Sequence, residues 1–229
     1  MDKAFDRSIG LLKEENFNII QQKTICIFGL GGVGGTAIEA LVRTGFSNVI
    51  LVDFDNVDVS NLNRQVLFTR NEVGKSKVEC AKQRLLSINP DLDVSIYKIK
   101  AQDFDFNQKI DFVIDAIDDV NGKVFIAKNC IEKKIPFLIS LGMANRFDPS
   151  KVKISKLNKT FNDPLAKKIR YIFKENVISL NAINVIWSEE SSVPYEGKLN
   201  SIMTVPSAAG LNIAYYVINY FIKENKDNE

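Results

Sequence analysis

Short apolar runs alternate with amphipathic stretches over the first 150 residues. Four runs are continuous, as strands buried on both faces of a parallel sheet are, and they lie at 24–28, 49–52, 112–114 and 137–140. A fifth segment, 94–99, alternates apolar and polar residues like a strand. Helical spacing of apolar residues occurs between these strands, at 36–44, 77–88 and 123–133. Strands that alternate with helices predict a Rossmann-like, doubly wound α/β fold with a mainly parallel sheet.

The pattern changes after Pro149. Two strand-like segments, 152–157 and 183–187, are separated by a charged helix at 165–173, which predicts a mixed or antiparallel C-terminal extension of the sheet. The apolar stretch 206–222 is short for a membrane span of about 20 residues, so we expect a buried closing helix and no membrane span. We expect one domain without a separate linker.

Amino-acid composition limits the kinds of function that the protein can have. The 229 residues are 45% hydrophobic, enough for a sizeable core, and the net charge of +2 neither favours nor excludes a nucleic-acid partner. The start of the chain lacks the features of a secretory signal, so we expect a cytoplasmic protein. Cys26, Cys80 and Cys130 are single and far apart, which predicts no zinc site, and we interpret them as small buried hydrophobic residues. The chain has no histidine, so imidazole acid–base chemistry is excluded.

A glycine-rich loop follows the first predicted strand. Gly29, Gly31, Gly32 and Gly34 match the Gly-x-Gly-x-x-Gly pattern in the context that gives it meaning, between a strand and a helix. Such a loop lets the backbone approach phosphate and directs helix N–H groups at it. Asp53 ends the second apolar run about 20 residues on, where a carboxylate accepts hydrogen bonds from ribose hydroxyls. These features predict a nucleotide site that fits NAD as well as ATP.

Charged and amide residues further along the chain distinguish between a site for ATP and a site for NAD. They are Asp55, Asn61, Arg64, Gln65, Lys77, Asp118 and Asp119. A dinucleotide enzyme needs no such cations, whereas a triphosphate carries several negative charges that an arginine fork and a lysine can hold. We therefore expect ATP, although Arg64 or Lys77 taken alone fits a solvated surface equally well.

Together these residues resemble the adenylating family of ubiquitin-activating enzymes and their bacterial relatives in molybdopterin and thiamine biosynthesis. The resemblance implies a single ThiF-type domain over 1–229, with nucleotide bound by 1–150 and substrate and dimer contacts made by 151–229. It implies that ATP and Mg²⁺ are held by the motif positions Gly31, Gly32, Asp53, Asn61, Arg64, Lys77 and Asp118. Of these, Arg64, Lys77 and Asp118 would be catalytic, and Asp118 would meet Mg²⁺ through ATP.

The opening segment Phe5-Asp6-Arg7-Ser8-Ile9 resembles the N-terminal helix of the same family. The arginine of that helix reaches the triphosphate of the neighbouring subunit. The resemblance therefore implies that Arg7 is catalytic across a homodimer. Taken alone, Arg7 fits an exposed terminal arginine equally well.

The second half resembles one branch of this family. Members that activate sulfur-carrier proteins commonly have two zinc-binding Cys-x-x-Cys pairs, and this chain has none. The segment Lys159-Thr160-Phe161-Asn162-Asp163-Pro164-Leu165-Ala166 instead resembles the tRNA threonylcarbamoyladenosine dehydratases, as do 185–190 and 205–210, so the resemblance covers nearly the whole chain. Asp163 and Pro164 also predict a capped helix start.

The resemblance implies a reaction on the modified adenosine beside the anticodon of tRNA. Its threonine carboxylate would attack the α-phosphate of ATP, and the ureido nitrogen would then displace AMP and close a ring, with net loss of water. Positioning and charge neutralisation are the protein's tasks, and no covalent nucleophile is required. Four basic side chains near the predicted helix start would contact tRNA phosphate or form a solvated face, and they are Lys159, Lys167, Lys168 and Arg170.

Two other functions stay open at this point. One is adenylation of the C-terminal glycine of a ubiquitin-like sulfur carrier, and the other is a nucleotide-binding scaffold without turnover. Involvement of a sulfurtransferase partner is also open. The region 181–188 contains no cysteine, which disfavours a thioester mechanism, so a general base would be a carboxylate, a lysine or the substrate itself.

Overall fold

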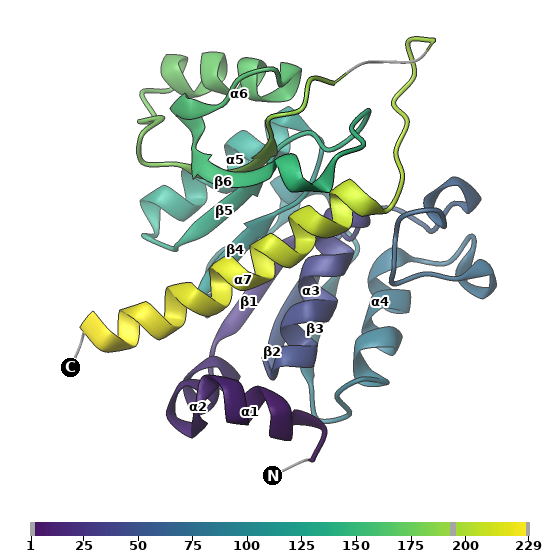
Figure 1. The fold of residues 1–229 in the computed structure, drawn as a ribbon, viewed down its shortest axis with the longest axis vertical. Helices are drawn as coiled ribbons and strands as arrows, with labels where there is room; N and C mark the ends of the chain where they lie inside the picture. Colours follow the sequence, from purple (N-terminus) through teal and green to yellow (C-terminus); the bar gives the residue numbers. More distant parts are fainter. Residues whose placement is uncertain (1–2, 193–195, 228–229) are drawn as a thin grey trace.

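The computed structural model describes residues 3–192 and 196–227, and within them one mainly parallel sheet forms the centre of the molecule (Figure 1). Its strands are β1 Thr24–Phe28, β2 Asn48–Val52, β3 Asp93–Tyr97, β4 Phe112–Asp115, β5 Phe137–Ser140, β6 Val152–Lys156 and β7 Asn184–Ser188. They lie side by side in the order β3-β2-β1-β4-β5-β7-β6. Every neighbouring pair is parallel except β6 and β7, which are antiparallel. The doubly wound sheet and its antiparallel extension are both confirmed.

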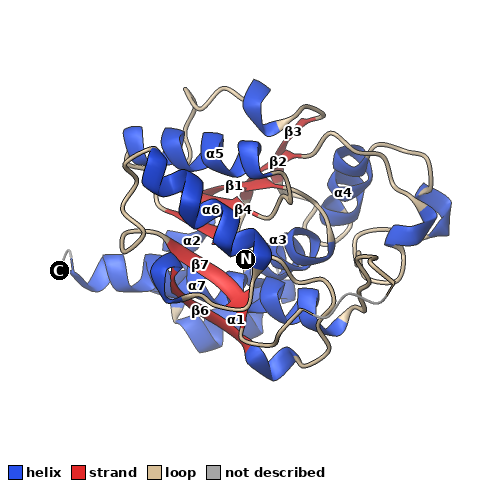
Figure 2. Cartoon of the chain, turned by 90° about the horizontal axis from the view of Figure 1, so that it is seen from above, coloured by secondary structure: helices blue, strands red, loops and turns tan. Residues whose placement is uncertain are grey.

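Helices cover both faces of this sheet (Figure 2). The α-helices are α1 Asp6–Leu12, α2 Glu14–Gln21, α3 Gly32–Thr44, α4 Lys77–Leu86, α5 Val120–Glu132, α6 Pro164–Glu175 and α7 Thr204–Asp227. Short 3-10 turns are η1 Lys3–Phe5, η2 Val59–Asn61, η3 Arg70–Glu72, η4 Ala101–Asp103, η5 Pro149–Lys151 and η6 Leu157–Lys159. None of the described helices is long and apolar enough to cross a membrane.

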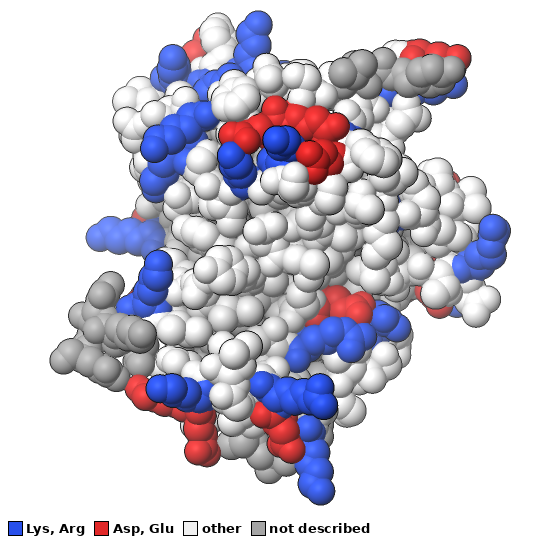
Figure 3. Space-filling view, in the orientation of Figure 1, with Lys and Arg blue, Asp and Glu red and all other residues white. Residues whose placement is uncertain are grey.

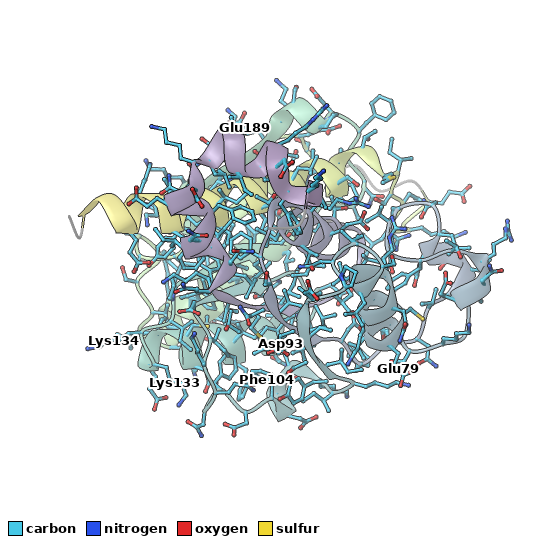
Figure 4. The ribbon with its side chains drawn as sticks, turned by 90° about the horizontal axis from the view of Figure 1, so that it is seen from below. Glu79, Asp93, Phe104, Lys133, Lys134 and Glu189 are labelled. Carbon is cyan, nitrogen blue, oxygen red and sulfur yellow. The ribbon has the colours of Figure 1, made fainter. Side chains whose placement is uncertain are left out.

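Alternate residues of β1 build the two cores, because successive side chains of a strand point to opposite faces. Ile25 and Ile27 pack in the core beneath α2, α3, α4 and α7. Cys26 and Phe28 pack on the other face with the core that contains Phe104, which is labelled in Figure 4, and residues of α5. This burial on both sides explains why β1 is continuously apolar in the sequence.

The strand order reverses between β1 and β4. The chain passes from β1 outward to β2 and β3, and then returns to build the opposite half of the sheet from β4. A crevice opens outside the carboxyl ends of the strands at such a switch point, and ligands of open α/β sheets bind there. The glycine loop follows β1, and Asp118 and Asp119 follow β4, so both segments lie at this crevice.

Candidate active site

The glycine loop joins β1 to α3 in a tight turn. Gly29 has φ +90°, a conformation that L side chains rarely adopt. A Cβ at Gly34 would lie 1.9 Å from the carbonyl oxygen of Gly29, so a larger residue would break the turn. α3 begins at Gly32, and its N-terminal N–H groups are therefore available to an anion at the switch point.

Asp53 holds this loop in place from the end of β2. Its side chain accepts hydrogen bonds from the backbone N–H of Leu30 at 2.7 Å and from that of Asp55 at 2.9 Å. Burial raises the pKa of the Asp53 carboxyl, and the ammonium group of Lys77 opposes this shift. Asp53 thus fixes the loop, and the second lone pair of each carboxylate oxygen remains for a ribose hydroxyl.

A cavity of about 600 Å³ lies beside the loop, and we call it the nucleotide cavity. Nearly all the residues that the sequence predicts to bind ATP line it, which are Gly29, Gly31, Gly32, Asp53, Asp55, Asn61, Arg64, Gln65, Lys77, Asp118 and Asp119. Gly34 does not line the cavity but packs against Gly29. Arg7 is exposed on α1 and lines neither this cavity nor the one described below. The fold therefore brings together a predicted set that is dispersed over 90 positions of the chain.

The two predicted phosphate ligands differ in their surroundings. Lys77 is buried, with 6% of its surface exposed, and its Nζ lies 2.8 Å from Asp55 Oδ2, so the solvated-surface reading of this lysine is wrong. Arg64 is partly exposed and donates through Nη1 to the Ser60 carbonyl and to Asn63 Oδ1. Its Nε and Nη2 have no hydrogen-bond partner among residues 3–192 and 196–227, so they are free to bind a phosphate.

Asp118 and Asp119, after β4, have different roles. Asp119 caps α5 by accepting hydrogen bonds from the backbone N–H groups of Asn121 and Gly122. Asp118 is exposed and has no polar partner in the described part of the chain. A single free carboxylate beside a phosphate site suits Mg²⁺, which is bound by one or two carboxylates together with substrate phosphates. Asp118 fits that ion, and the described residues contain no cluster of three or more ligands that would hold a metal by protein alone.

The sequence does not predict a buried ion pair that lies close to Asp118 and Asp119 in the chain. Lys123 of α5 and Asp115 of β4 both have fully buried side chains, and the Lys123 Nζ lies 2.8 Å from Asp115 Oδ1. The same Nζ donates to the carbonyl oxygen of Ser140 at 2.8 Å. The lysine thus ties the carboxyl ends of β4 and β5 together. Its charge and its place in an amphipathic helix gave no sign of burial.

A second cavity, of about 770 Å³, adjoins the first, and we call it the substrate-side cavity. Gly32, Arg64 and the segment 116–118 line both cavities. On its other side the substrate-side cavity is lined by Gly142, Arg146 and Asp163, beyond β5 and before α6. The crevice therefore continues from the nucleotide toward the second half of the chain.

The predicted tRNA contacts lie around the start of α6. Asp163 caps this helix by accepting from the backbone N–H of Ala166 at 2.9 Å, as the sequence predicts. Lys159, Lys167 and Lys168 are exposed, and Figure 3 shows lysine and arginine side chains gathered near α6. Arg170 differs, because its Nη1 donates to the carbonyl and hydroxyl oxygens of Thr160 and so ties α6 to the preceding segment.

All three cysteines are buried and free. Burial raises the pKa of each thiol, which keeps the reactive thiolate scarce. Their interpretation as small buried hydrophobic residues is confirmed by this packing.

Comparison with known proteins agrees with the geometry. The ThiF family model matches residues 5–225. A Bacillus subtilis tRNA threonylcarbamoyladenosine dehydratase is 33% identical over 242 aligned residues, which cover 96% of this chain and 95% of that protein. The Escherichia coli enzyme of the same name is 35% identical over 178 residues, which cover 76% of this chain and 66% of that protein.

Comparison with solved structures also finds tRNA threonylcarbamoyladenosine dehydratases. The crystal structure of the Escherichia coli tRNA threonylcarbamoyladenosine dehydratase in complex with ATP superposes with a TM-score of 0.92 at 29% identity, covering 99% of this chain and 97% of that chain. The same enzyme has also been solved with AMP, with a TM-score of 0.92. The chain belongs to the ThiF family, together with the tRNA threonylcarbamoyladenosine dehydratases.

Proposed function

We propose that this protein is an ATP-dependent tRNA threonylcarbamoyladenosine dehydratase that activates the threonine carboxylate of its substrate as an acyl adenylate. The observation that carries the proposal is the shared wall of the two cavities. Arg64 and Asp118 lie on that wall, so a carboxylate entering from the substrate-side cavity meets the phosphates of ATP between them. Relatives that align over most of this chain carry the dehydratase name, and sulfur-carrier adenylation is not favoured.

The residues of the nucleotide cavity have distinct tasks in this proposal. The N-terminus of α3 and the glycine loop hold phosphate oxygens, and Asp53 positions the loop while accepting a ribose hydroxyl. Arg64 and Lys77 neutralise the charge that collects on pyrophosphate as it leaves. Mg²⁺, held by Asp118 and the phosphates, would supply further charge neutralisation. ATP contacts would come from residues 1–150, and residues 151–229 would add Asp163 and α7 to the substrate and second-subunit contacts that Gly142, Arg146 and Arg7 also make.

No protein nucleophile is needed for this chemistry. The threonine carboxylate is itself the nucleophile toward the α-phosphate, and the ureido nitrogen is the nucleophile that displaces AMP. Both are held next to their targets by the cavities, and such positioning contributes much of the rate. The buried cysteines support this direct route. Its test is exchange of labelled pyrophosphate into ATP, which should require tRNA that carries threonylcarbamoyladenosine.

We further propose a homodimer in which Arg7 completes the site of the partner subunit. The face across α3 and α7 carries few charges in Figure 3. Leu211 and Tyr215 of α7 are more than half exposed. Leu11 of α1 is 85% exposed. Arg7 contacts neither cavity of its own chain, as a residue that works across a dimer would.

A homodimer with Arg7 in the partner's site predicts that two weakly active variants complement each other. Arg7→Ala and Arg64→Ala should each be weakly active, whereas a mixture of the two variants should recover part of the activity, because mixed dimers contain one site with both arginines intact. Arg70→Ala, which alters an exposed arginine of η3 outside the cavities, is the control for Arg7→Ala. A monomer in sedimentation that is fully active at high dilution would contradict the proposal.

The four basic residues around the start of α6 predict how affinity for tRNA depends on salt concentration. If Lys159, Lys167, Lys168 and Arg170 follow the phosphate path of an anticodon arm, log affinity for tRNA should fall against log salt by about 0.7 to 0.9 per contact. Lys167→Glu with Lys168→Glu should reduce both tRNA affinity and this slope and leave ATP affinity unchanged. Lys133→Glu with Lys134→Glu, after the end of α5, is the matched control pair. An unchanged slope in the α6 variant would remove the segment from the tRNA interface.

A further inference from the structure

The far wall of the substrate-side cavity contains a buried arginine and a buried aspartate. Arg146 is 5% exposed and Asp163 is 4% exposed. Arg146 Nη2 lies 3.3 Å from Asp163 Oδ2 and also donates to the carbonyl of Asn162. Its Nε donates to the carbonyl of Glu190 at 3.0 Å. These contacts fix the guanidinium firmly in the wall.

One nitrogen of this guanidinium is unused. Arg146 Nη1 has no hydrogen-bond partner anywhere in the described ranges, although the residue is buried. Asp163 accepts one hydrogen bond on Oδ1, from Ala166, and one on Oδ2, so lone pairs remain on both oxygens. The wall therefore offers one free donor next to one free acceptor.

Gly142 keeps this pair uncovered. A Cβ at that position would lie 3.6 Å from Arg146 Nη1 and 3.7 Å from both carboxylate oxygens of Asp163. These are ordinary van der Waals contacts, so a methyl group would fit and would cover the donor and the acceptor together. The glycine thus leaves a recess of about one side-chain atom in front of the ion pair.

We propose that Gly142, Arg146 and Asp163 form the subsite for the ureido group that joins threonine to adenine in the substrate. This assignment rests on the proposed function. A ureido group has a carbonyl oxygen beside its N–H groups, which complements the free Nη1 donor and the Asp163 acceptor. Only the Cα and one nitrogen separate the ureido carbon from the carboxylate carbon. A ureido group in this recess therefore directs the carboxylate along the cavity toward Arg64.

The carboxylate itself is a poorer occupant of the recess. The charge of Arg146 is already compensated by Asp163, and a second carboxylate would lie beside the first. Arg64 has no ion pair among the described residues and lies on the wall shared with the nucleotide cavity, where the carboxylate must be to attack phosphorus. Charge therefore places the neutral ureido group at Arg146 and the anionic group at Arg64.

The test is Gly142→Ala. Removing Arg146 would leave a buried carboxylate and endanger the fold, whereas the added methyl of Gly142→Ala makes no clash. Two tRNAs of one sequence, with threonylcarbamoyladenosine or unmodified adenosine beside the anticodon, are compared by equilibrium binding without ATP. We expect the unaltered protein to favour the modified tRNA by about tenfold or more, the effect of one or two charge-assisted hydrogen bonds.

In Gly142→Ala this preference should fall toward one, KM for the modified tRNA should rise, and affinity for ATP should not change. Gly10→Ala, which meets no atom within 4 Å on the exposed helix α1, is the matched control and should keep the preference. Full preference and an unchanged KM in Gly142→Ala would overturn the subsite. If the unaltered protein itself neither prefers nor converts the modified tRNA, the proposed function fails, and the subsite fails with it.

Discussion

Arg64→Ala is expected to reduce pyrophosphate exchange strongly while the protein stays folded. The guanidinium contacts its own loop through Nη1 only, so its loss removes little from the core. A hydrogen bond to a charged group contributes about 1.5 to 3 kcal/mol, which corresponds to about a tenfold to hundredfold loss for each phosphate contact. The measurement is the exchange rate of labelled pyrophosphate into ATP with modified tRNA present.

Arg70→Ala is the matched control for this experiment, because Arg70 is exposed on the neighbouring turn η3 and lines neither cavity. It should keep the parental rate. Lys77→Ala should also lose exchange, but with a lower melting temperature, since Lys77 is buried and paired with Asp55. Normal exchange in a well-folded Arg64→Ala protein would rule out Arg64 as a phosphate ligand.

Lys123→Met is expected to have the largest effect on stability. It leaves the carboxylate of Asp115 fully buried without its cation, and Asp115 Oδ2 already has no hydrogen-bond partner in the described structure. Breaking a buried ion pair from one side costs about 3 to 5 kcal/mol. The free energy of unfolding, measured by urea titration at neutral pH, should fall by about this amount.

The loss of stability in Lys123→Met should depend on pH. Burial raises the pKa of Asp115, and the ammonium of Lys123 is the main factor that opposes this shift. Without Lys123, the pKa of Asp115 would be higher in the folded protein than in the unfolded chain. The free energy of unfolding would therefore fall as pH rises above the pKa that Asp115 has in the unfolded chain. The difference in stability from the parent protein would be smaller in acid. Lys128→Met, on the exposed side of α5, should be nearly neutral. An equally stable Lys123→Met protein would show that the pair is not needed for folding.

The nucleotide cavity was predictable because its signals are local in the sequence. The glycines, Asp53 and Asp118 each lie within a few residues of the end of an apolar run, and parallel strands bring their carboxyl ends to one edge of the sheet. The start of α3 is harder to predict from the sequence. Gly32 to Gly35 contain three glycines, which are poor helix formers, so the predicted helix began at residue 36, whereas tight packing against neighbouring segments supports it from Gly32.

The substrate-side cavity was not predictable in the same way. Arg146 and Asp163 are 17 residues apart and belong to a loop and a helix cap, and no periodicity relates them. The sequence identifies Asp163 as a helix cap and as part of a segment that resembles the family, and neither feature relates it to Arg146. Burial of Lys77 and Lys123 was also hidden, because a lysine in a helix is usually solvated and only the tertiary structure supplies its partner.

ATP-dependent dehydration is tested by mass analysis of tRNA nucleosides after incubation with the purified protein, ATP and Mg²⁺, with no sulfurtransferase added. We expect threonylcarbamoyladenosine to be converted to a product lighter by one water, with one AMP and one pyrophosphate formed for each nucleoside. Omission of ATP should abolish the product. An unchanged nucleoside in the complete reaction, together with pyrophosphate exchange that a small sulfur-carrier protein stimulates and tRNA does not, would contradict it.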